Sequence, residues 1–183
     1  LFPPPYDQAD LALNIALKQV VYKGNTLAAL DSRTTLKAAR LRSENKATVN
    51  EGPVRILVDL DASQKDPPLT AELEAKDVRL DIEMPKTARY FLPVLAGGKG
   101  ITGKLTLELL KVEGRGANWE TLRENVHTVQ DGKVHVSSGE VQGAPFLAKL
   151  GEVLRKPELG DIKFDTIAVV FRIRQKRLEN ETT

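Results

Sequence analysis

The chain has 183 residues, of which 41% are hydrophobic and 28% charged, with a formal net charge of +2. This length predicts one domain or a pair of small ones, and the composition is that of a folded chain. So balanced a charge gives no indication of nucleic-acid binding. The chain has no cysteine and two histidines, which excludes disulfides, thiolate zinc sites and cysteine nucleophiles and disfavours a histidine-rich metal site.

The N-terminal residues carry no recognisable targeting signal. Leu1–Pro5 lacks a basic start and an apolar run, and no stretch of about eighteen apolar residues occurs anywhere in the chain. The first residue is not Met, so we expect an excised or processed piece of a longer protein. The three consecutive prolines exclude a helix interior or a strand centre, and they predict an extended leader over residues 1–9.

Residues 10–84 alternate between apolar and polar side chains with a period of two, which is typical of half-buried strands. Turn signals such as Lys23-Gly24-Asn25 and Asn50-Glu51-Gly52 separate the runs. Because short connections cannot make parallel crossovers, we expect an antiparallel meander. The expected strands are residues 10–22, Thr26–Leu30, Arg33–Leu41, Lys46–Asn50, 54–60, 69–76 and 78–82.

Residues 85–178 are expected to add three short helices to the sheet. Pro85 begins a helical pattern over residues 85–95. Asn118 is a candidate N-cap for a helix over 119–125. The third pattern, residues 144–154, is amphipathic, with an apolar stripe at helical spacing.

The remaining pattern of this half indicates strands. A long one carries Leu105, Leu107 and Leu109 and ends near Gly114. Asp131-Gly132 is the strongest hairpin signal in the chain. Phe164–Ile173 is expected to be the last strand, and residues 179–183 are expected to fray as a charged tail.

The order of several short motifs carries more information than any one of them. In chain order they are Lys99–Leu105, Gly114-Arg115-Gly116, Trp119–Leu122, Asp131–Val134, Gly143–Phe146, Pro157–Ile162 and Phe164-Asp165. This succession, together with the strand–turn–strand unit around Tyr22–Asn25, resembles the C-terminal region of the AsmA-like family of bacterial envelope proteins. The resemblance covers about residues 10–178.

The resemblance implies a mainly β (α+β) fold: an elongated, curved antiparallel sheet in a single domain, with an open apolar groove. It further implies a non-enzymatic, periplasmic module, anchored to the inner membrane through a segment absent from this chain. Family members are associated with outer-membrane assembly and lipid homeostasis. Phospholipid or lipopolysaccharide acyl chains, other envelope proteins, and further strands of the same full-length chain are the expected partners. No catalytic residue, metal or cofactor comes with the family.

A carrier of acyl chains needs an apolar face that its own core does not consume, because hiding a chain from water is worth about 0.8 kcal/mol per methylene. Alternation in strands places every second side chain on one face. The alternative is that these residues are ordinary core, covered by a second layer. The candidate lipid-binding residues are Leu13, Ile15, Leu17, Ile56, Val58, Leu107, Leu109, Val169 and Phe171.

Other polar residues give weaker indications. His127 and His135 are expected to be surface or core histidines rather than metal ligands. Carboxylate pairs such as Asp59 and Asp61 occur in glycosidases, but on a strand they more often form a solvated face. A structural or protein-interaction module with a closed core is the alternative function, and an enzyme is the least favoured hypothesis.

Overall fold

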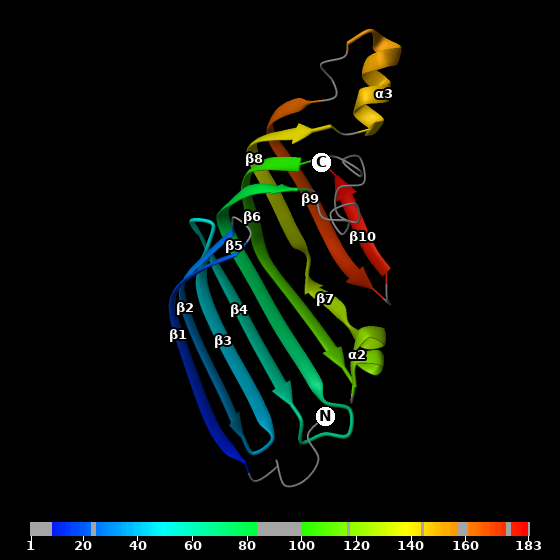
Figure 1. Ribbon diagram of the computed structural model, residues 1–183. Helices are drawn as coiled ribbons and strands as arrows, with labels where there is room; N and C mark the ends of the chain where they lie inside the picture. Colours follow the sequence, from blue (N-terminus) through cyan, green and yellow to red (C-terminus); the bar gives the residue numbers. More distant parts are fainter. Residues whose placement is uncertain are drawn as a thin grey trace.

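The computed structural model describes residues 9–22, 25–83, 100–116, 118–143, 145–156, 161–174 and 177–182. They form one open antiparallel sheet with two short helices beside it. The expected mainly β fold with an antiparallel sheet is therefore confirmed. Figure 1 shows long strands side by side, with α2 beside the lower ends of β6 and β7 and α3 beyond the upper ends of β8 and β9.

The sheet has ten strands, in the order β1-β2-β3-β4-β5-β6-β8-β9-β10, with β7 pairing beside β6. Their neighbours are sequential almost throughout, as short connections require. Strands β1 and β10 form the two edges. The strands are β1 (Asp10–Tyr22), β2 (Asn25–Lys37), β3 (Arg40–Val49), β4 (Gly52–Asp61), β5 (Pro68–Glu83), β6 (Gly100–Arg115), β7 (His127–Gln130), β8 (Gly132–Gln142), β9 (Ile162–Arg174) and β10 (Arg177–Thr182).

The expected division of residues 26–41 into two strands is wrong. One strand, β2, runs from Asn25 to Lys37, and its register against β3 shifts between Ala28 and Asp31. The turn comes later, at Ala38 and Ala39, which both have positive φ values of 47° and 60°. Positive φ at two central residues is the geometry of a tight hairpin turn, and here two alanines adopt it without a glycine that would signal it in the sequence.

Strand β5 is likewise one continuous element where two runs were expected. Its register against β6 shifts at Ala75, and Asp77 has a φ of 51°. The turn between β3 and β4 packs against this irregular stretch: a Cβ at Gly52 would overlap the backbone of Lys76 and Val78. The side-chain amide of Asn50, in that turn, donates to the Arg79 carbonyl at 3.1 Å. Glycine at position 52 is what allows this close approach.

Asp131-Gly132 does not form a hairpin, which corrects the sequence-based expectation. Strands β7 and β8 both pair antiparallel with β6, at successive stretches along it. The two residues therefore join two segments of one interrupted strand. Gly132 lies opposite Phe171, whose ring occupies the space of a Cβ at this position, and the Asp131 carboxylate accepts from the Arg172 Nε at 3.1 Å. The dipeptide marks a close packing contact rather than a reversal of the chain.

Helix α2 (Trp119–Asn125) has the expected bounds and N-cap. The Asn118 side chain accepts from the backbone N–H of Thr121 at 3.0 Å, and the Thr121 hydroxyl accepts from the Asn118 backbone N–H, which completes a capping box. Helix α3 (Pro145–Leu154) matches the amphipathic pattern over 144–154. The helix expected over 85–95 lies outside the described residues.

Phe164–Ile173 belongs to β9, but it is not the last strand. Residues Arg177–Thr182 form β10, which pairs with β9 from Arg177 opposite Arg174 to Thr182 opposite Val169. The expectation of a frayed tail over 179–183 is therefore wrong for residues 179–182, because strand pairing holds them. Nearly all of the leader expected over residues 1–9 lies outside the described residues.

The best-buried part of the sheet lies where β6, β8 and β9 meet. Ile101, Val136 and Val141 form a buried cluster, and the last two side chains are 2% and 1% exposed. The partly buried Phe164 packs against this cluster and covers Gly139, as Phe171 covers Gly132. A ring over a glycine of the neighbouring strand fills the gap left by the missing side chain.

We expect Gly132→Ala to destabilise the chain by about 1–3 kcal/mol, because the new methyl group overlaps the Phe171 ring and forces it to shift. The measurement is chemical denaturation followed by circular dichroism. In the Phe171→Leu background the same substitution should cost less, because the smaller side chain leaves room for the methyl. An equal cost in both backgrounds would show that the ring contact does not restrict position 132.

Candidate functional site

The strand register assigns the side chains of β1–β6 to two chemically different faces. Residues that lie directly opposite one another in neighbouring strands point to the same side of a sheet. One aligned row is Ile15, Ser32, Asn45, Ile56, Leu73 and Leu110, and the next is Leu13, Thr34, Ser43, Val58, Ala71 and Val112. We call the face that carries these rows the apolar face and the other the charged face.

A third row of the apolar face is almost entirely leucine. It consists of Leu11, Leu36, Leu41, Leu60 and Leu69, and it ends at Gly114. It crosses five successive strands without a polar residue. The row could not be predicted from the sequence, because alternation in one strand does not reveal which residue of the next strand lies opposite.

A small polar patch interrupts the apolar face at β2 and β3. The Ser32 hydroxyl donates to the Asn45 side chain at 2.6 Å, and the Thr34 and Ser43 hydroxyls lie 2.8 Å apart. These groups satisfy one another's hydrogen-bonding needs within the sheet. Apolar side chains of β1 lie on one side of the patch and those of β4–β6 on the other.

The candidate lipid-binding residues differ in exposure. Leu13, Leu17 and Ile56 are 50%, 42% and 40% exposed, Ile15 is also exposed, and Val58 is half-buried. The structure therefore leaves the β1 and β4 candidates open to a ligand.

The candidates on β6 and β9 lie in a different environment. Leu107, Val169 and Phe171 belong to the buried core, which is the alternative expected for alternating apolar residues of a strand. Leu109 is not among the β6 residues aligned with the apolar face. The register shifts between Leu107, which lies opposite Ala75, and Leu110, which lies opposite Leu73. Simple alternation predicts that Leu107 and Leu109 lie on the same face. A β-bulge changes this, and the apolar and polar pattern of the sequence does not show where a bulge occurs.

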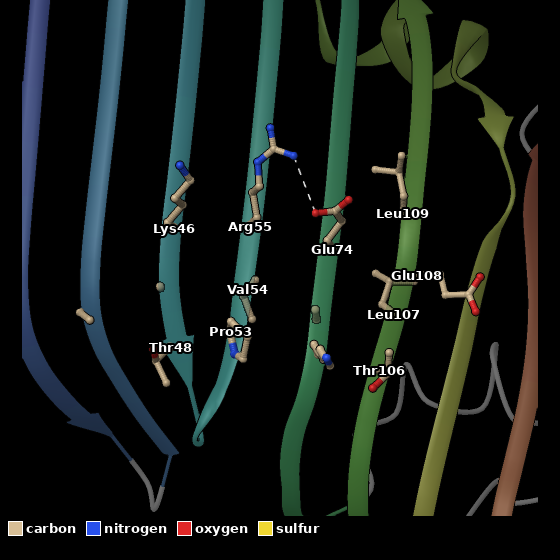
Figure 2. Close-up of a pocket in the computed structure, with 14 residues that line it drawn as sticks. Lys46, Thr48, Pro53, Val54, Arg55, Glu74, Thr106, Leu107, Glu108 and Leu109 are labelled. Atoms are coloured by element: carbon tan, nitrogen blue, oxygen red, sulfur yellow. Dashed lines mark ion pairs between the residues drawn. The ribbon is translucent and has the colours of Figure 1, made fainter.

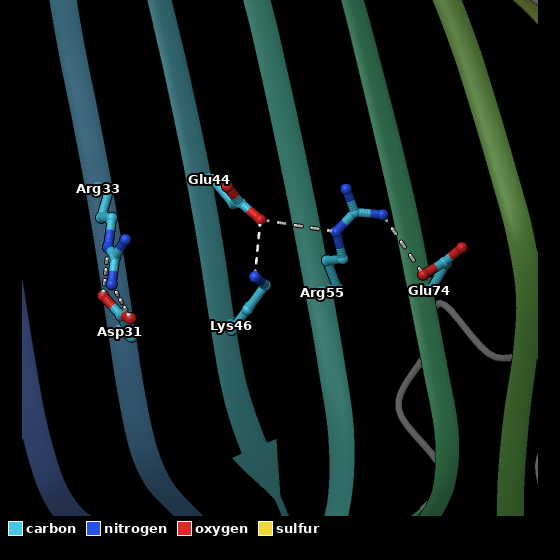
Figure 3. A network of polar contacts seen from close by, with 6 residues as sticks. All are labelled: Asp31, Arg33, Glu44, Lys46, Arg55 and Glu74. Carbon is cyan, nitrogen blue, oxygen red and sulfur yellow. Dashed lines mark hydrogen bonds and ion pairs between the residues drawn. The ribbon is translucent and has the colours of Figure 1, made fainter.

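The charged face carries the ion pairs of β2–β6. Glu44 lies 2.9 Å from the Lys46 ammonium and 3.9 Å from the Arg55 guanidinium, which also reaches Glu74 at 3.7 Å. Figure 3 shows this chain of contacts crossing β3, β4 and β5, with the Arg33–Asp31 pair on β2 beside it. All these side chains are partly exposed, so each pair contributes little to the stability of the fold. The arrangement keeps this face in water and balances its charge.

The surrounding cations lower the pKa of Glu44. The hydrogen bond from Lys46 contributes most, and the positive charges of Lys46, Arg55 and Arg42 add to it. On the same face, hydrogen bonds from the Ser63 hydroxyl and backbone lower the pKa of Asp61. Both carboxyls are therefore held ionised, in the role of structural anions.

An open hollow of about 670 Å³ spans β2–β6 (Figure 2). Its lining combines aliphatic residues such as Val54 and Leu107 with the charged Lys46, Arg55 and Glu74. Lys46 lies directly opposite Arg55, which pairs with Glu74 of the next strand, and Figure 2 draws this ion pair between Arg55 and Glu74. Neither a strong anion site nor a strong cation site results from such a lining.

The two histidines lie apart in the structure. The His135 Nε2 lies 3.2 Å from a Glu108 oxygen, whereas the His127 Nδ1 lies near the Asn125 carbonyl at 3.3 Å. The described residues contain no group of three or more potential ligands suited to a metal ion. Among the described helices, none is long and apolar enough to cross a membrane.

Comparison with family models, with curated proteins and with solved structures finds no match for this chain. The resemblance to the AsmA-like family therefore stays a prediction from the sequence.

We expect Glu44→Gln to lower stability above about pH 5 and to have little effect in strong acid. A carboxyl whose folded-state pKa lies below its ordinary value of 4.5 stabilises the fold above that value, and this stabilisation is lost as the pH falls through the folded-state pKa. The measurement is urea denaturation at several pH values. In the Lys46→Met background the effect should shrink, because the main cause of the shift is gone; an undiminished effect would contradict this account.

Proposed function

We propose that this chain is a non-enzymatic cell-envelope module that holds lipid acyl chains against the apolar face of its sheet. The observation that supports the proposal most directly is the chemical difference between the two faces. Aliphatic side chains line up across β1 and β4–β6 on one face, whereas paired charges cover the other. Exposed apolar surface of this kind marks a site of interaction with an apolar partner.

The side chains of the apolar face suit acyl chains better than planar ligands. The leucine row and its neighbours Ile56 and Val58 are aliphatic, and only 5% of the chain is aromatic. An acyl chain has no hydrogen-bonding groups, so a row of methyl-bearing side chains that crosses several strands matches both its chemistry and its length. Each methylene removed from water contributes about 0.8 kcal/mol.

The setting of this activity follows from the resemblance to the AsmA-like family. We place the module in the periplasm, as part of a longer protein anchored to the inner membrane through a segment outside residues 1–183. There it serves outer-membrane assembly or lipid transport, with phospholipid or lipopolysaccharide as the source of the acyl chains and further strands or other envelope proteins as neighbours. We further propose that the apolar face forms a curved groove that holds the acyl chains.

The test is saturable lipid binding. Delipidated protein is titrated with fluorescently labelled phospholipid and, in a separate experiment, with labelled lipopolysaccharide. We expect saturable binding of at least one of them. An absence of saturable binding to both would overturn the proposal and leave the alternative of a structural or protein-interaction module.

A matched pair of variants on β4 locates the binding face. We expect Ile56→Gln to weaken lipid binding about three- to tenfold, because it puts a polar group on the apolar face in place of a branched aliphatic side chain. The control is Leu57→Gln, the next residue, which lies on the charged face between Glu44 and Glu72. Equal losses in the two variants would mean that the apolar face is not the binding surface.

A further inference from the structure

Strand β1 is an edge of the sheet with an unusual lack of protection. All thirteen of its residues are exposed, and its outer side has no neighbour among the described strands. Within Asp10–Tyr22 the only charged residues are Asp10 and Lys18, and there is no proline. A long edge strand with so few charges presents its free backbone groups as a template for another strand.

The opposite edge differs from β1 in length and in charge. Strand β10 has six residues, and its sequence includes Arg177, Glu179 and Glu181. Short length and charged residues are the usual means by which proteins prevent edge-to-edge pairing. The contrast marks β1, rather than β10, as the edge that takes a partner.

We propose that two copies of this chain pair antiparallel through β1, about a two-fold axis at Asn14. In a symmetric pairing centred there, residue 10 lies opposite residue 18 of the second copy, residue 11 opposite 17, and residue 13 opposite 15. Asp10 then faces Lys18 at both ends of the pairing. Of the symmetric registers, only this one places the two charged residues of the strand opposite one another.

The apolar side chains match in the same register. Leu11 lies opposite Leu17, and Leu13 lies opposite Ile15, all on the apolar face. On the charged face, Ala12 lies opposite Ala16 and Asn14 opposite the second Asn14. Cross-strand aliphatic pairs and opposite-charge pairs each add to the stability of an antiparallel pair. A two-fold axis perpendicular to the sheet also keeps the apolar faces of the two copies on the same side.

This inference does not depend on lipid binding, since it rests on the backbone edge and the residue pairs of β1. Main-chain hydrogen bonds between the strands supply affinity, and the side-chain pairs select the register. The symmetry is of the closed type, so assembly stops at a dimer.

Cysteine cross-linking tests the register directly, because the chain contains no cysteine of its own. We expect the Asn14→Cys variant to form a covalent dimer under mild oxidation, since position 14 faces itself across the axis. Ala12→Cys and Ala16→Cys are matched controls on the same strand and face. Neither should cross-link with itself, because four residues of strand separate the two thiols by about 13 Å. A mixture of the two variants should cross-link.

Other results of this experiment would overturn the proposal. Equal cross-linking of all three variants with themselves would indicate non-specific contact. A monomeric wild-type chain in sedimentation velocity at high concentration, without cross-linking of Asn14→Cys, would mean that β1 does not pair with itself. A ladder of larger species would indicate head-to-tail pairing, and pairing only with a strand of another protein would name a different partner.

Charge exchange gives a second, independent test that does not use cysteines. We expect Asp10→Lys and Lys18→Asp each to weaken dimerisation about tenfold or more, because each places like charges opposite one another twice. Mixing the two variants should restore association as a heterodimer, and the double variant Asp10→Lys/Lys18→Asp should again form a homodimer. Both positions are exposed, so circular dichroism should show unchanged folding. Failure of the mixture to associate would reject this register.

Discussion

The structure depends on the division of side chains between the two faces of a single antiparallel layer. In β1–β6 every side chain points to one side or the other. The register aligns Leu41, Leu60 and Leu69 on one face, and it places opposite charges such as Arg42 and Asp59 across from one another on the other face. The charged face remains in contact with water, and its carboxylates and cations pair with one another. That pairing leaves the apolar face as the surface on which a partner gains most from contact, since removing apolar area from water is the main favourable contribution to association.

Around β6, β8 and β9, far from β1, the same alternating pattern leads to burial of the apolar side chains. Around Ile101, Val136 and Val141 the aliphatic side chains are buried, and the rings of Phe164 and Phe171 lie over glycines of the neighbouring strand. The sheet therefore has a closed part, which provides a core, and an open part near β1. The proposed binding of acyl chains would use the side chains of this open part, and the proposed edge pairing would use the backbone of β1.

Several local irregularities make this arrangement possible. Residues with positive φ, among them Ala29, Asp77 and Ser138, lie where the register shifts and allow long strands to stay paired while they change direction. A shift of one residue reverses the faces of all that follows. A bulge thus brings odd-numbered and even-numbered residues of one strand onto the same face. Leu107, Leu110 and Val112 of β6 are one example.

The sequence by itself determined the class of fold, the meander of strands, the bounds and cap of α2 and the amphipathic α3, because periodicity and capping are local properties. It also indicated Leu13, Ile15 and Ile56 as members of one face. Only the tertiary structure decided that Asp131-Gly132 interrupts a strand, that two alanines make a turn, and that Leu109 leaves the row while Leu107 and Phe171 are buried. Those outcomes depend on which residue of another strand lies opposite, and the apolar and polar pattern within one strand does not contain that information.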